Sequence, residues 1–309
     1  MALMGLDIGT SGCKCSIFDL EGNIKSTAYE EYATEHPRPG WIEMNPLKVW
    51  QAVKKTIFNA NQFNSGERVK AVCISSFGES AIPIDKDGNV LYNSLMYTDP
   101  RGKEQVQTLV NRLGFENIMK DTGLPAHHMY TIGTIMWLKE NLPAVYDRTW
   151  KFLLYGDYVN YKLTGLTVID YSLASRTMAM NVVDKKWEAK IFDAADVDRH
   201  MFSDISPSGR IISTVKQEIA EELGLLPTTL VVTGGHDQAC AALGGGILKK
   251  GLAIDSMGSV ECITPLISSP VFNSAMLHYR YNYSPHVQEG QYLTFAVYFP
   301  GDRCLNGIG

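Results

Sequence analysis

The sequence predicts an α/β protein of about two domains. Three observations carry this prediction. Three short apolar runs separated by turn residues open the chain, a segment with apolar residues at helical spacing follows them, and further strand and helix patterns then follow one another along the chain. The length agrees, because 309 residues at roughly 150 residues per domain correspond to about two domains.

The opening runs predict a meander of three strands, at residues 3–8, 14–20 and 24–32. Its first turn is rich in glycine and hydroxyl groups, and its second turn is Glu21-Gly22-Asn23. A helix is predicted to begin after Asn45, because asparagine is a preferred N-cap and Pro46 suits the first helical position.

The middle of the chain mixes strands and helices. Buried strands are predicted at residues 69–74 and 230–232, and helices at residues 101–113, 132–141, 155–163 and 216–223. Gly224 stops the last of these helices. The strand at 230–232 runs into a Gly234-Gly235 turn. After it, a helix of small residues is expected from residue 238 to the glycines at 244–246.

The pattern restarts after these glycines, with strands at 252–256 and 260–265 joined by a turn at 257–259. Asp255-x-x-Gly258-Ser259 repeats the order of acid, glycine and hydroxyl seen in Asp7-x-Gly9-Thr10-Ser11. We therefore expect a first domain over residues 1–246 and the beginning of a second, related domain over 247–309. A unit of about 60 residues is marginal on its own, so the second domain is expected to be truncated.

Composition excludes several classes of protein. The net charge is −5, from 28 basic and 33 acidic residues without a basic block, which argues against nucleic acid as a partner. The longest apolar run is five residues, so no membrane span is expected. The N-terminus does not read as a signal peptide, and the six cysteines form no C-x-x-C pair, which together indicate a cytoplasmic protein.

The first segment suited to chemistry is Asp7-Ile8-Gly9-Thr10-Ser11-Gly12. Glycines let backbone N–H groups approach a phosphate, hydroxyls add donors, and an acid beside phosphates commonly meets a metal ion. The segment matches neither a P-loop nor a dinucleotide fingerprint, because the lysine motif is missing and a strand follows. The alternative is a plain tight hairpin.

The second such segment is Gly234-Gly235-His236-Asp237-Gln238. Here an acid stands at the start of a helix, where the helix dipole keeps it ionised. An ionised carboxylate in a cleft can accept the proton of a sugar hydroxyl. The alternative is an ordinary aspartate helix cap.

Two further segments, Phe77-Gly78-Glu79-Ser80 and Tyr97-Thr98-Asp99-Pro100-Arg101, each follow a predicted strand. Polyol recognition needs several donors and acceptors in fixed geometry, which an acid paired with arginine can provide. The alternatives are solvated loops, and a helix start for the pair Asp99 and Arg101.

Taken in order, these segments resemble the FGGY family of carbohydrate kinases, which includes xylulokinase, gluconokinase and glycerol kinase. The resemblance covers residues 1 to about 265. Any one motif is weak, but five in the right order are specific: the segments beginning at Asp7, Thr98 and Gly234, together with Gly40-Trp41-Ile42-Glu43-Met44-Asn45-Pro46 and Asp170-Tyr171-Ser172 with Ala174-Ser175-Arg176-Thr177.

The resemblance implies an actin-like ATPase fold of two ribonuclease H-like domains, with ATP and Mg²⁺ mainly on the second domain and a sugar, polyol or sugar acid mainly on the first. It implies a phosphotransferase, possible as a homodimer, in which Asp237 is the general base and also contacts the substrate. The implied phosphate hairpins are Asp7, Gly9, Thr10, Ser11 and Lys14, and then Gly258 and Ser259, with Asp7 orienting magnesium through water. The implied sugar contacts are Gly78, Glu79, Asp99, Arg101 and Tyr130.

The chain departs from this family pattern in two respects. The glycine motif for adenosine is expected beyond residue 309, which leaves ATP binding by these residues alone open. Gly78-Glu79 matches neither the Arg-Glu of glycerol kinase-like members nor the Met-His of xylulokinase-like members. Three rival interpretations remain: a non-catalytic sugar-binding module, a sugar-independent ATPase of the same fold, and a structural relative of actin that polymerises.

Overall fold

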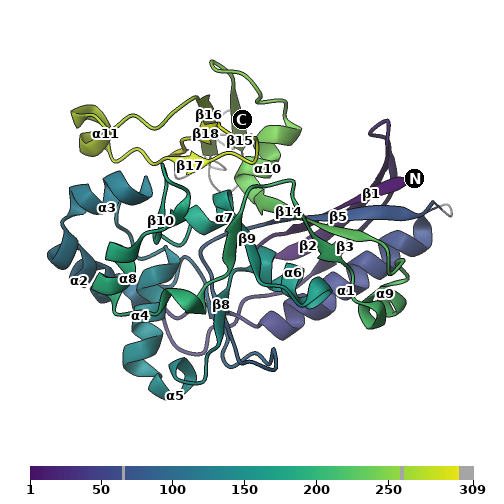
Figure 1. The fold of residues 1–309 in the computed structure, drawn as a ribbon, viewed down its shortest axis with the longest axis horizontal. Coiled ribbons are helices and arrows are strands. Elements are labelled where there is room, and N and C mark those ends of the chain that lie inside the picture. Colours follow the sequence, from purple (N-terminus) through teal and green to yellow (C-terminus); the bar gives the residue numbers. More distant parts are fainter. Residues whose placement is uncertain (65–66, 258–260, 299–309) are drawn as a thin grey trace, which may run out of the picture.

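A six-stranded mixed sheet forms one side of the molecule, on the right in Figure 1. The computed structural model describes residues 1–64, 67–257 and 261–298. The sheet has the order β13-β14-β5-β1-β2-β3, with the bounds Ile211–Thr214, Leu230–His236, Val69–Ser76, Ala2–Ile8, Gly12–Asp19 and Ile24–Glu31.

The strand directions bring three strand ends to one edge. The predicted meander is confirmed, because β1, β2 and β3 pair antiparallel. Strands β5 and β14 then add in parallel to β1, so that Ile8, Ser76 and His236 lie level with one another. The loops after these three strands therefore meet at the same edge, as in other parallel sheets whose ligands bind beyond the carboxyl ends of the strands.

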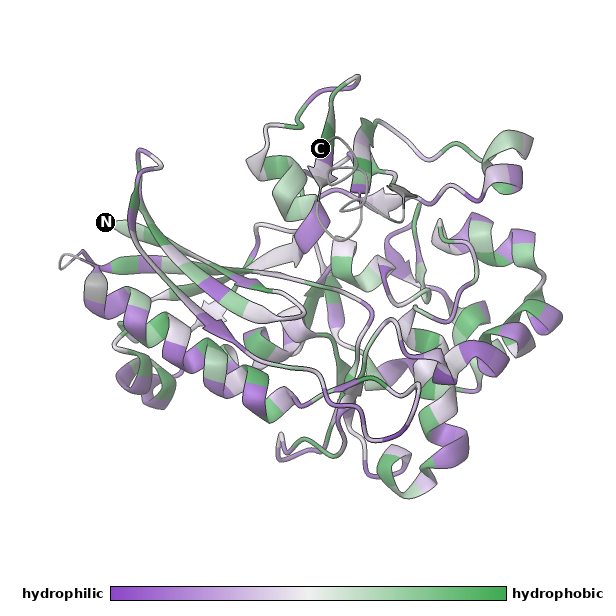
Figure 2. Cartoon of the chain, turned by 180° about the vertical axis from the view of Figure 1, so that it is seen from behind, coloured by the Kyte–Doolittle hydropathy of each residue, from purple (hydrophilic) through white to green (hydrophobic). Residues whose placement is uncertain are grey.

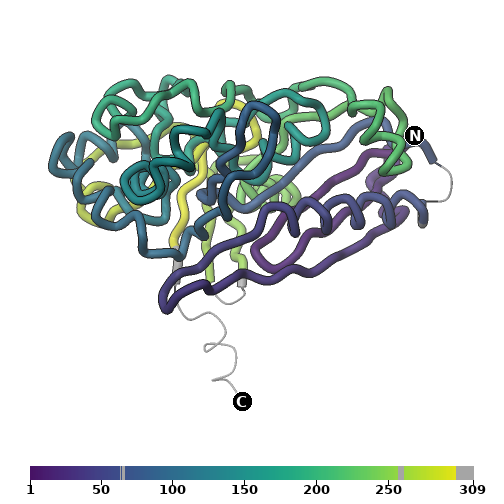
Figure 3. The backbone as a smooth tube through the Cα atoms, turned by 90° about the horizontal axis from the view of Figure 1, so that it is seen from below, coloured from purple at the N-terminus to yellow at the C-terminus, as the bar shows by residue number. Residues whose placement is uncertain are grey.

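Helices cover one face of this sheet. The helix α1 (Pro46–Phe63) begins as predicted, with the Asn45 side chain accepting from the N–H groups of Leu47 and Lys48. It packs along β2 and β3, as the view from below shows (Figure 3). Green apolar residues alternate with purple polar ones along it in Figure 2, and the apolar side joins the core. Two further helices complete the layer, α6 (Tyr155–Thr164) and α9 (Gln217–Leu223).

A second hydrophobic core lies beside the sheet and is mainly helical. It contains the helices α2 (Lys103–Leu113), α3 (Phe115–Thr122), α4 (Thr131–Asn141), α5 (Pro143–Tyr146), α7 (Tyr171–Ser175) and α8 (Ala189–Ala195) and the 3₁₀ turns Pro100–Gly102 and Arg199–Met201. Short strand pairs accompany it: β4 (Glu43–Met44) with β7 (Ser94–Leu95), β6 (Ile82–Ile84) with β8 (Lys151–Leu153), β9 (Val168–Asp170) with β12 (Asp204–Ser206), and β10 (Met180–Asn181) with β11 (Lys186–Trp187). The helix predicted from residue 101 is therefore confirmed, although its first turn is 3₁₀.

The last part of the chain forms its own small sheet, at the top of Figure 1. The predicted hairpin is confirmed as β15 (Ala253–Met257) and β16 (Glu261–Ile267). The other elements here are α10 (Asp237–Gly244), α11 (Ser274–Tyr279), β17 (Ser284–Pro285), β18 (Tyr292–Leu293) and β19 (Ala296–Tyr298). Gly258 and Ser259 lie outside the described residues, and the domain division after residue 246 stays a prediction.

One element differs from its prediction. Strand β14 does not end before Gly234-Gly235 but continues through both glycines to His236. Its register against β5 shifts between Val232 and Gly235. A β-carbon on Gly234 would lie 1.8 Å from the carbonyl oxygen of Ile74, so the glycine permits the two strands to approach closely rather than to turn. Within the described residues, no helix is both long and apolar enough to cross a membrane.

Candidate active site

The glycine- and hydroxyl-rich turn after β1 forms one wall of the candidate site. The N–H of Gly9 donates to the carbonyl of Gly12 over 2.9 Å, and the Tyr32 hydroxyl donates to the Gly9 carbonyl over 2.7 Å. Thr10 and Ser11 form the tip, and Ser11 is exposed. The turn is therefore braced from outside while its tip stays open to solvent.

Asp7 stands beside this turn on the sheet face that α1 does not cover. Its Oδ1 accepts from the Ser75 hydroxyl over 2.8 Å, and Lys14 lies opposite it on β2. Desolvation is the main reason why the pKa of the Asp7 carboxyl is raised, and the negative charge of Asp237 adds to this rise. The structure thus brings Asp7, Gly9, Thr10, Ser11 and Lys14 together, with Asp237 close enough to act on Asp7.

Asp237 is the first residue of α10 and follows β14 directly. Its Oδ1 accepts from the N–H of Gln238 over 2.6 Å, and 33% of its side chain is exposed. Burial raises its pKa to about 6, although the nearby Arg176 charge lowers it. A carboxylate with a pKa near the working pH, partly open to solvent, suits general base catalysis.

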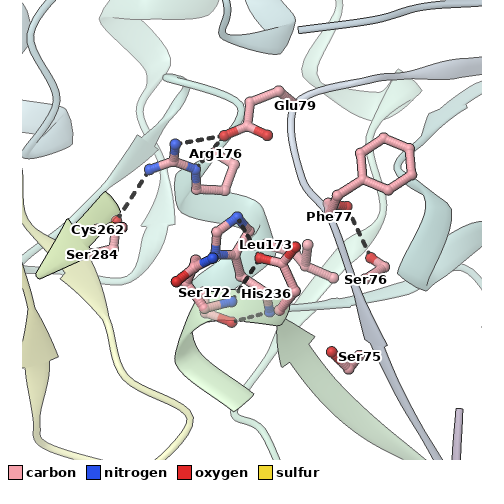
Figure 4. A network of polar contacts seen from close by, with 12 residues as sticks. Ser75, Ser76, Phe77, Glu79, Ser172, Leu173, Arg176, His236, Cys262 and Ser284 are labelled. Atoms are coloured by element: carbon pink, nitrogen blue, oxygen red, sulfur yellow. Dashed lines mark hydrogen bonds and ion pairs between the residues drawn. The ribbon is translucent and has the colours of Figure 1, made fainter. Parts of the chain in front are cut away.

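His236 lies between Asp237 and the core. Burial and the Arg176 charge lower its pKa to about 4, so the imidazole is neutral at physiological pH. Its Nε2 lies 3.4 Å from Asp237 Oδ1, which makes the contact polar rather than ionic. The backbone N–H of His236 donates to the hydroxyl of Ser172 over 2.8 Å (Figure 4).

Glu79 and Arg176 form a buried ion pair beside His236 (Figure 4). Arg176 Nε donates to Glu79 Oε1 over 2.6 Å, and the guanidinium lies 5.1 Å from the centre of the Tyr130 ring. Thr131 Oγ1 donates to the Glu79 carbonyl over 2.6 Å and so holds a residue whose φ of 69° is unusual without glycine. Glu79 Oε2 makes no hydrogen bond within the described residues.

Gly78 owes its place to packing. A β-carbon there would lie 2.8 Å from Arg176 Cγ and 3.1 Å from His236 Cδ2. Any side chain at position 78 would therefore push Arg176 or His236 out of the site. Position 78, at which this chain differs from both glycerol kinase-like and xylulokinase-like members, is thus a position where Arg176 and His236 leave room only for glycine.

Asp99 and Arg101 belong to a separate buried network. Asp99 accepts from the backbone N–H and from the guanidinium of Arg101, and its Oδ2 also accepts from the N–H of Ile42. Arg101 donates in addition to Glu43 over 2.8 Å and stacks 3.9 Å from the Trp41 ring. No hydrogen bond or ion pair among residues 1–64, 67–257 and 261–298 joins this network to Glu79 or Asp237. Its geometry fixes the loop around Trp41.

Comparison with known proteins decides the family. The model of the FGGY family of carbohydrate kinases, N-terminal domain, matches residues 2–244. The chain belongs to the FGGY family of carbohydrate kinases.

Relatives in this family include a xylulose kinase of Lactococcus lactis, which is 30% identical over 307 residues, and a glycerol kinase of Thermococcus kodakarensis, which is 29% identical over 264. These alignments cover 98% and 83% of this chain, but only 60% and 52% of the relatives. The chain thus spans roughly half to three fifths of their length.

Solved structures agree on the fold. The ligand-bound xylulose kinase from Lactobacillus acidophilus superposes with a TM-score of 0.91 at 24% identity, and covers 99% of this chain and 61% of its own. The xylulose kinase from Rhodospirillum rubrum gives a TM-score of 0.93 at 22% identity. The predicted actin-like, ribonuclease H-like fold is confirmed.

Several residues of this FGGY chain reach the site without having been assigned a role from the sequence. Arg176, Ser172 and His236 contact Glu79 or the start of α10 from positions distant in the chain. Ser75 meets Asp7 across 68 positions. Ser172, Arg176 and His236 all stand in motifs that contributed to the family resemblance, but none of these three side chains was assigned a chemical role from the sequence.

Proposed function

We propose that this chain is the sugar-binding part of an ATP-dependent carbohydrate kinase, which transfers the γ-phosphoryl group of ATP to a hydroxyl of a sugar, polyol or sugar acid. The observation that carries the proposal is Asp237, a partly exposed carboxylate at the end of β14 with a pKa of about 6. At neutral pH it is ionised and able to accept the proton of a substrate hydroxyl.

Substrate binding falls to the groups beside Asp237. Glu79 Oε2 makes no hydrogen bond in the described part of the chain, and the Tyr130 hydroxyl lies within hydrogen-bond reach of Arg176, so both can contribute to sugar recognition. Gly78 gives Arg176 room to hold Glu79 in place. Direct sugar contacts by Asp99 and Arg101 stay predictions, since both side chains already bond to each other and to the Trp41 loop.

The phosphates of ATP would meet the turn after β1. Thr10, Ser11 and the backbone N–H groups near Gly9 supply donors, and Asp7 keeps one carboxylate oxygen without a hydrogen bond in the described part of the chain. This donor set suits magnesium held through water by Asp7. When bound, the metal would offset charge on the phosphates. The cytoplasmic location and the homodimer stay predictions.

Thermal unfolding of this chain with D-xylulose, glycerol and D-gluconate, without nucleotide, tests the proposal. A sugar that binds the folded state at 100 times its Kd stabilises it by about 2.7 kcal/mol, which is a clear shift in Tm. We expect at least one sugar to give this shift. No shift with any of the three, together with a shift caused by ATP and magnesium alone, would contradict the proposal and favour a sugar-independent ATPase.

Tyr130→Phe refines this test. It keeps the ring over Arg176 but removes the hydroxyl, so affinity for the stabilising sugar should fall about 3- to 10-fold, as for the loss of one hydrogen bond. Tyr146→Phe makes the same change on α5, outside the candidate site, and serves as the matched control. Equal affinities in the two variants would remove Tyr130 from the sugar site.

A further inference from the structure

A chain of hydrogen bonds runs from a buried acid to the residue before Asp237. Asp170 ends β9 and caps α7, and its Oδ1 accepts from the N–H groups of Ser172 and Leu173 over 2.8 and 3.1 Å. The same oxygen accepts from the Ser172 hydroxyl over 2.5 Å. Ser172 Oγ in turn accepts from the N–H of His236, and Figure 4 shows the two residues next to each other.

The direction of each hydrogen bond in the series Asp170–Ser172–His236 is fixed. A backbone N–H can only donate, so the Ser172 oxygen must accept from His236. The hydroxyl proton of Ser172 is then free for Asp170, which as a carboxylate is an acceptor. Asp170 thereby orients the lone pairs of Ser172 toward β14. All three residues are buried, with exposed fractions of 3% for Asp170, 1% for Ser172 and 8% for His236.

Close packing surrounds Gly235 at the end of β14. A β-carbon there would lie 2.3 Å from Val287 Cγ1 and 2.9 Å from Ser172 Oγ, so the absence of a side chain leaves room for both neighbours. The other end of α7 carries Arg176, which holds Glu79. One short helix therefore fixes both the start of α10 and the Glu79 turn.

We propose that Ser172, oriented by Asp170, is a positioning residue for Asp237, because it anchors the backbone from which the Asp237 side chain projects. The inference rests on the proposed function only for the role it gives Asp237. Breaking the anchor would let the start of α10 move toward solvent and carry the carboxylate out of its desolvated place.

The groups around Asp237 define what such a movement would change. Arg176 approaches it from the end of α7, Asp7 from β1 and the neutral His236 from β14. Three further groups also respond to its charge: Tyr97, Cys240 and, on β16, Cys262. Desolvation is the largest contribution to the pKa of Asp237. Exposure to water therefore lowers this pKa toward the ordinary aspartate value.

The experiment compares Ser172→Ala with Ser175→Ala. Ser175 lies on the same helix and is equally buried, but among the described residues its hydroxyl bonds only to the carbonyl of Ser172. The carboxyl carbon of Asp237 is followed by NMR in aspartate-labelled chain, without sugar or nucleotide, and Asp237→Asn identifies its signal.

In Ser172→Ala we expect the pKa of Asp237 to fall by about one unit, a tenfold change in proton affinity, and the His236 amide to exchange at least about tenfold faster. Ser175→Ala should titrate like the unmodified chain. Asp170→Asn retains an acceptor for the Ser172 hydroxyl and should stay close to the unmodified chain. The same Asp237 titration in Ser172→Ala and Ser175→Ala would overturn the proposal.

A second variant covers the case that Ser172→Ala does not fold. Ser172→Cys fills nearly the same space with a weaker donor and acceptor, so it should shift Asp237 in the same direction by a smaller amount. An unshifted titration in this variant would also overturn the proposal. Because no ligand is present, this test is independent of sugar binding: an empty sugar panel would defeat the proposed function and leave the anchoring of Asp237 standing.

Discussion

At the scale of single residues, the buried acids of the candidate site lower the stability of the folded chain when they are ionised. Asp237 and Asp7 are two acids at one sheet edge, and the charge of Asp237 contributes to the raised pKa of Asp7. A group whose pKa is raised on folding stabilises the folded state only while it is protonated, and this stability is lost as the pH rises through the folded-state pKa. Asp237 therefore weakens the fold at neutral pH.

Asp237→Asn should raise the free energy of unfolding at pH 8. A rise of the Asp237 pKa from 3.8 to about 6 corresponds to about 3 kcal/mol of unfolding free energy lost when the carboxyl ionises. We reduce this loss to about 1–2 kcal/mol because water reaches a third of the side chain. Below about pH 3 the difference should vanish, since Asp237 is then largely protonated in both the folded and the unfolded state. Urea denaturation from pH 3 to pH 8 measures it, and a variant less stable at pH 8 would refute this cost.

Arg101→Leu should cost about 3–5 kcal/mol of unfolding free energy, because it leaves Asp99 and Glu43 charged and buried without a partner. Lys48→Leu breaks an exposed pair with Glu35 and should cost no more than about 1 kcal/mol. Urea denaturation of both variants checks the contrast. Equal losses would mean that the Arg101 network does not brace the Trp41 loop.

At the scale of elements, local signals predicted well where the sequence alone determines the structure. Asn45 and Pro46 begin α1, and Gly224 ends α9 in the left-handed conformation. The predicted end of β14 was wrong. In the sequence Gly234-Gly235 resembles a turn, and only the structure shows that Gly234 packs against the backbone of Ile74. The roles of Ser172 and Arg176 were missed for the same reason, since their partners lie 64 and 97 positions away.

The N-cap of α1 gives an element-level prediction. Asn45→Ala removes the side-chain acceptor for two N–H groups and should cost about 1 kcal/mol. Gln51→Ala, on an exposed position of the same helix, should stay within about 0.5 kcal/mol. Denaturation midpoints of the two variants measure the difference, and a loss in Gln51→Ala as large as in Asn45→Ala would argue against the cap.

The two glycine positions around α10 make opposite predictions. Gly234→Ala forces a β-carbon against the Ile74 backbone and should cost more than about 4 kcal/mol or prevent folding. Gly244→Ala adds a methyl group in open space at the end of α10 and should stabilise by about 0.4–1 kcal/mol. Thermal unfolding of both variants measures the two changes in stability. A stable Gly234→Ala chain would show that β14 need not lie so close to β5.

At the scale of the whole molecule, the sheet is covered by helices on one face and carries its candidate chemistry at one edge. Asp7, the turn after β1 and Asp237 converge there because β1, β5 and β14 end level with one another. The chain spans 60% of the Lactococcus lactis relative, so the proposed role of Asp237 in phosphoryl transfer belongs to the whole kinase of which this chain is a part.

Transfer of the γ-phosphoryl group from ATP to D-xylulose, glycerol or D-gluconate, by the kinase of which this chain is the proposed sugar-binding part and by the Asp237→Asn variant of that kinase, tests this role most directly. We predict a phosphorylated product from at least one sugar, with a rate that falls about 10²- to 10⁴-fold in Asp237→Asn while sugar affinity is nearly unchanged. Equal rates in the two proteins, or ADP release without a phosphorylated sugar, would contradict it.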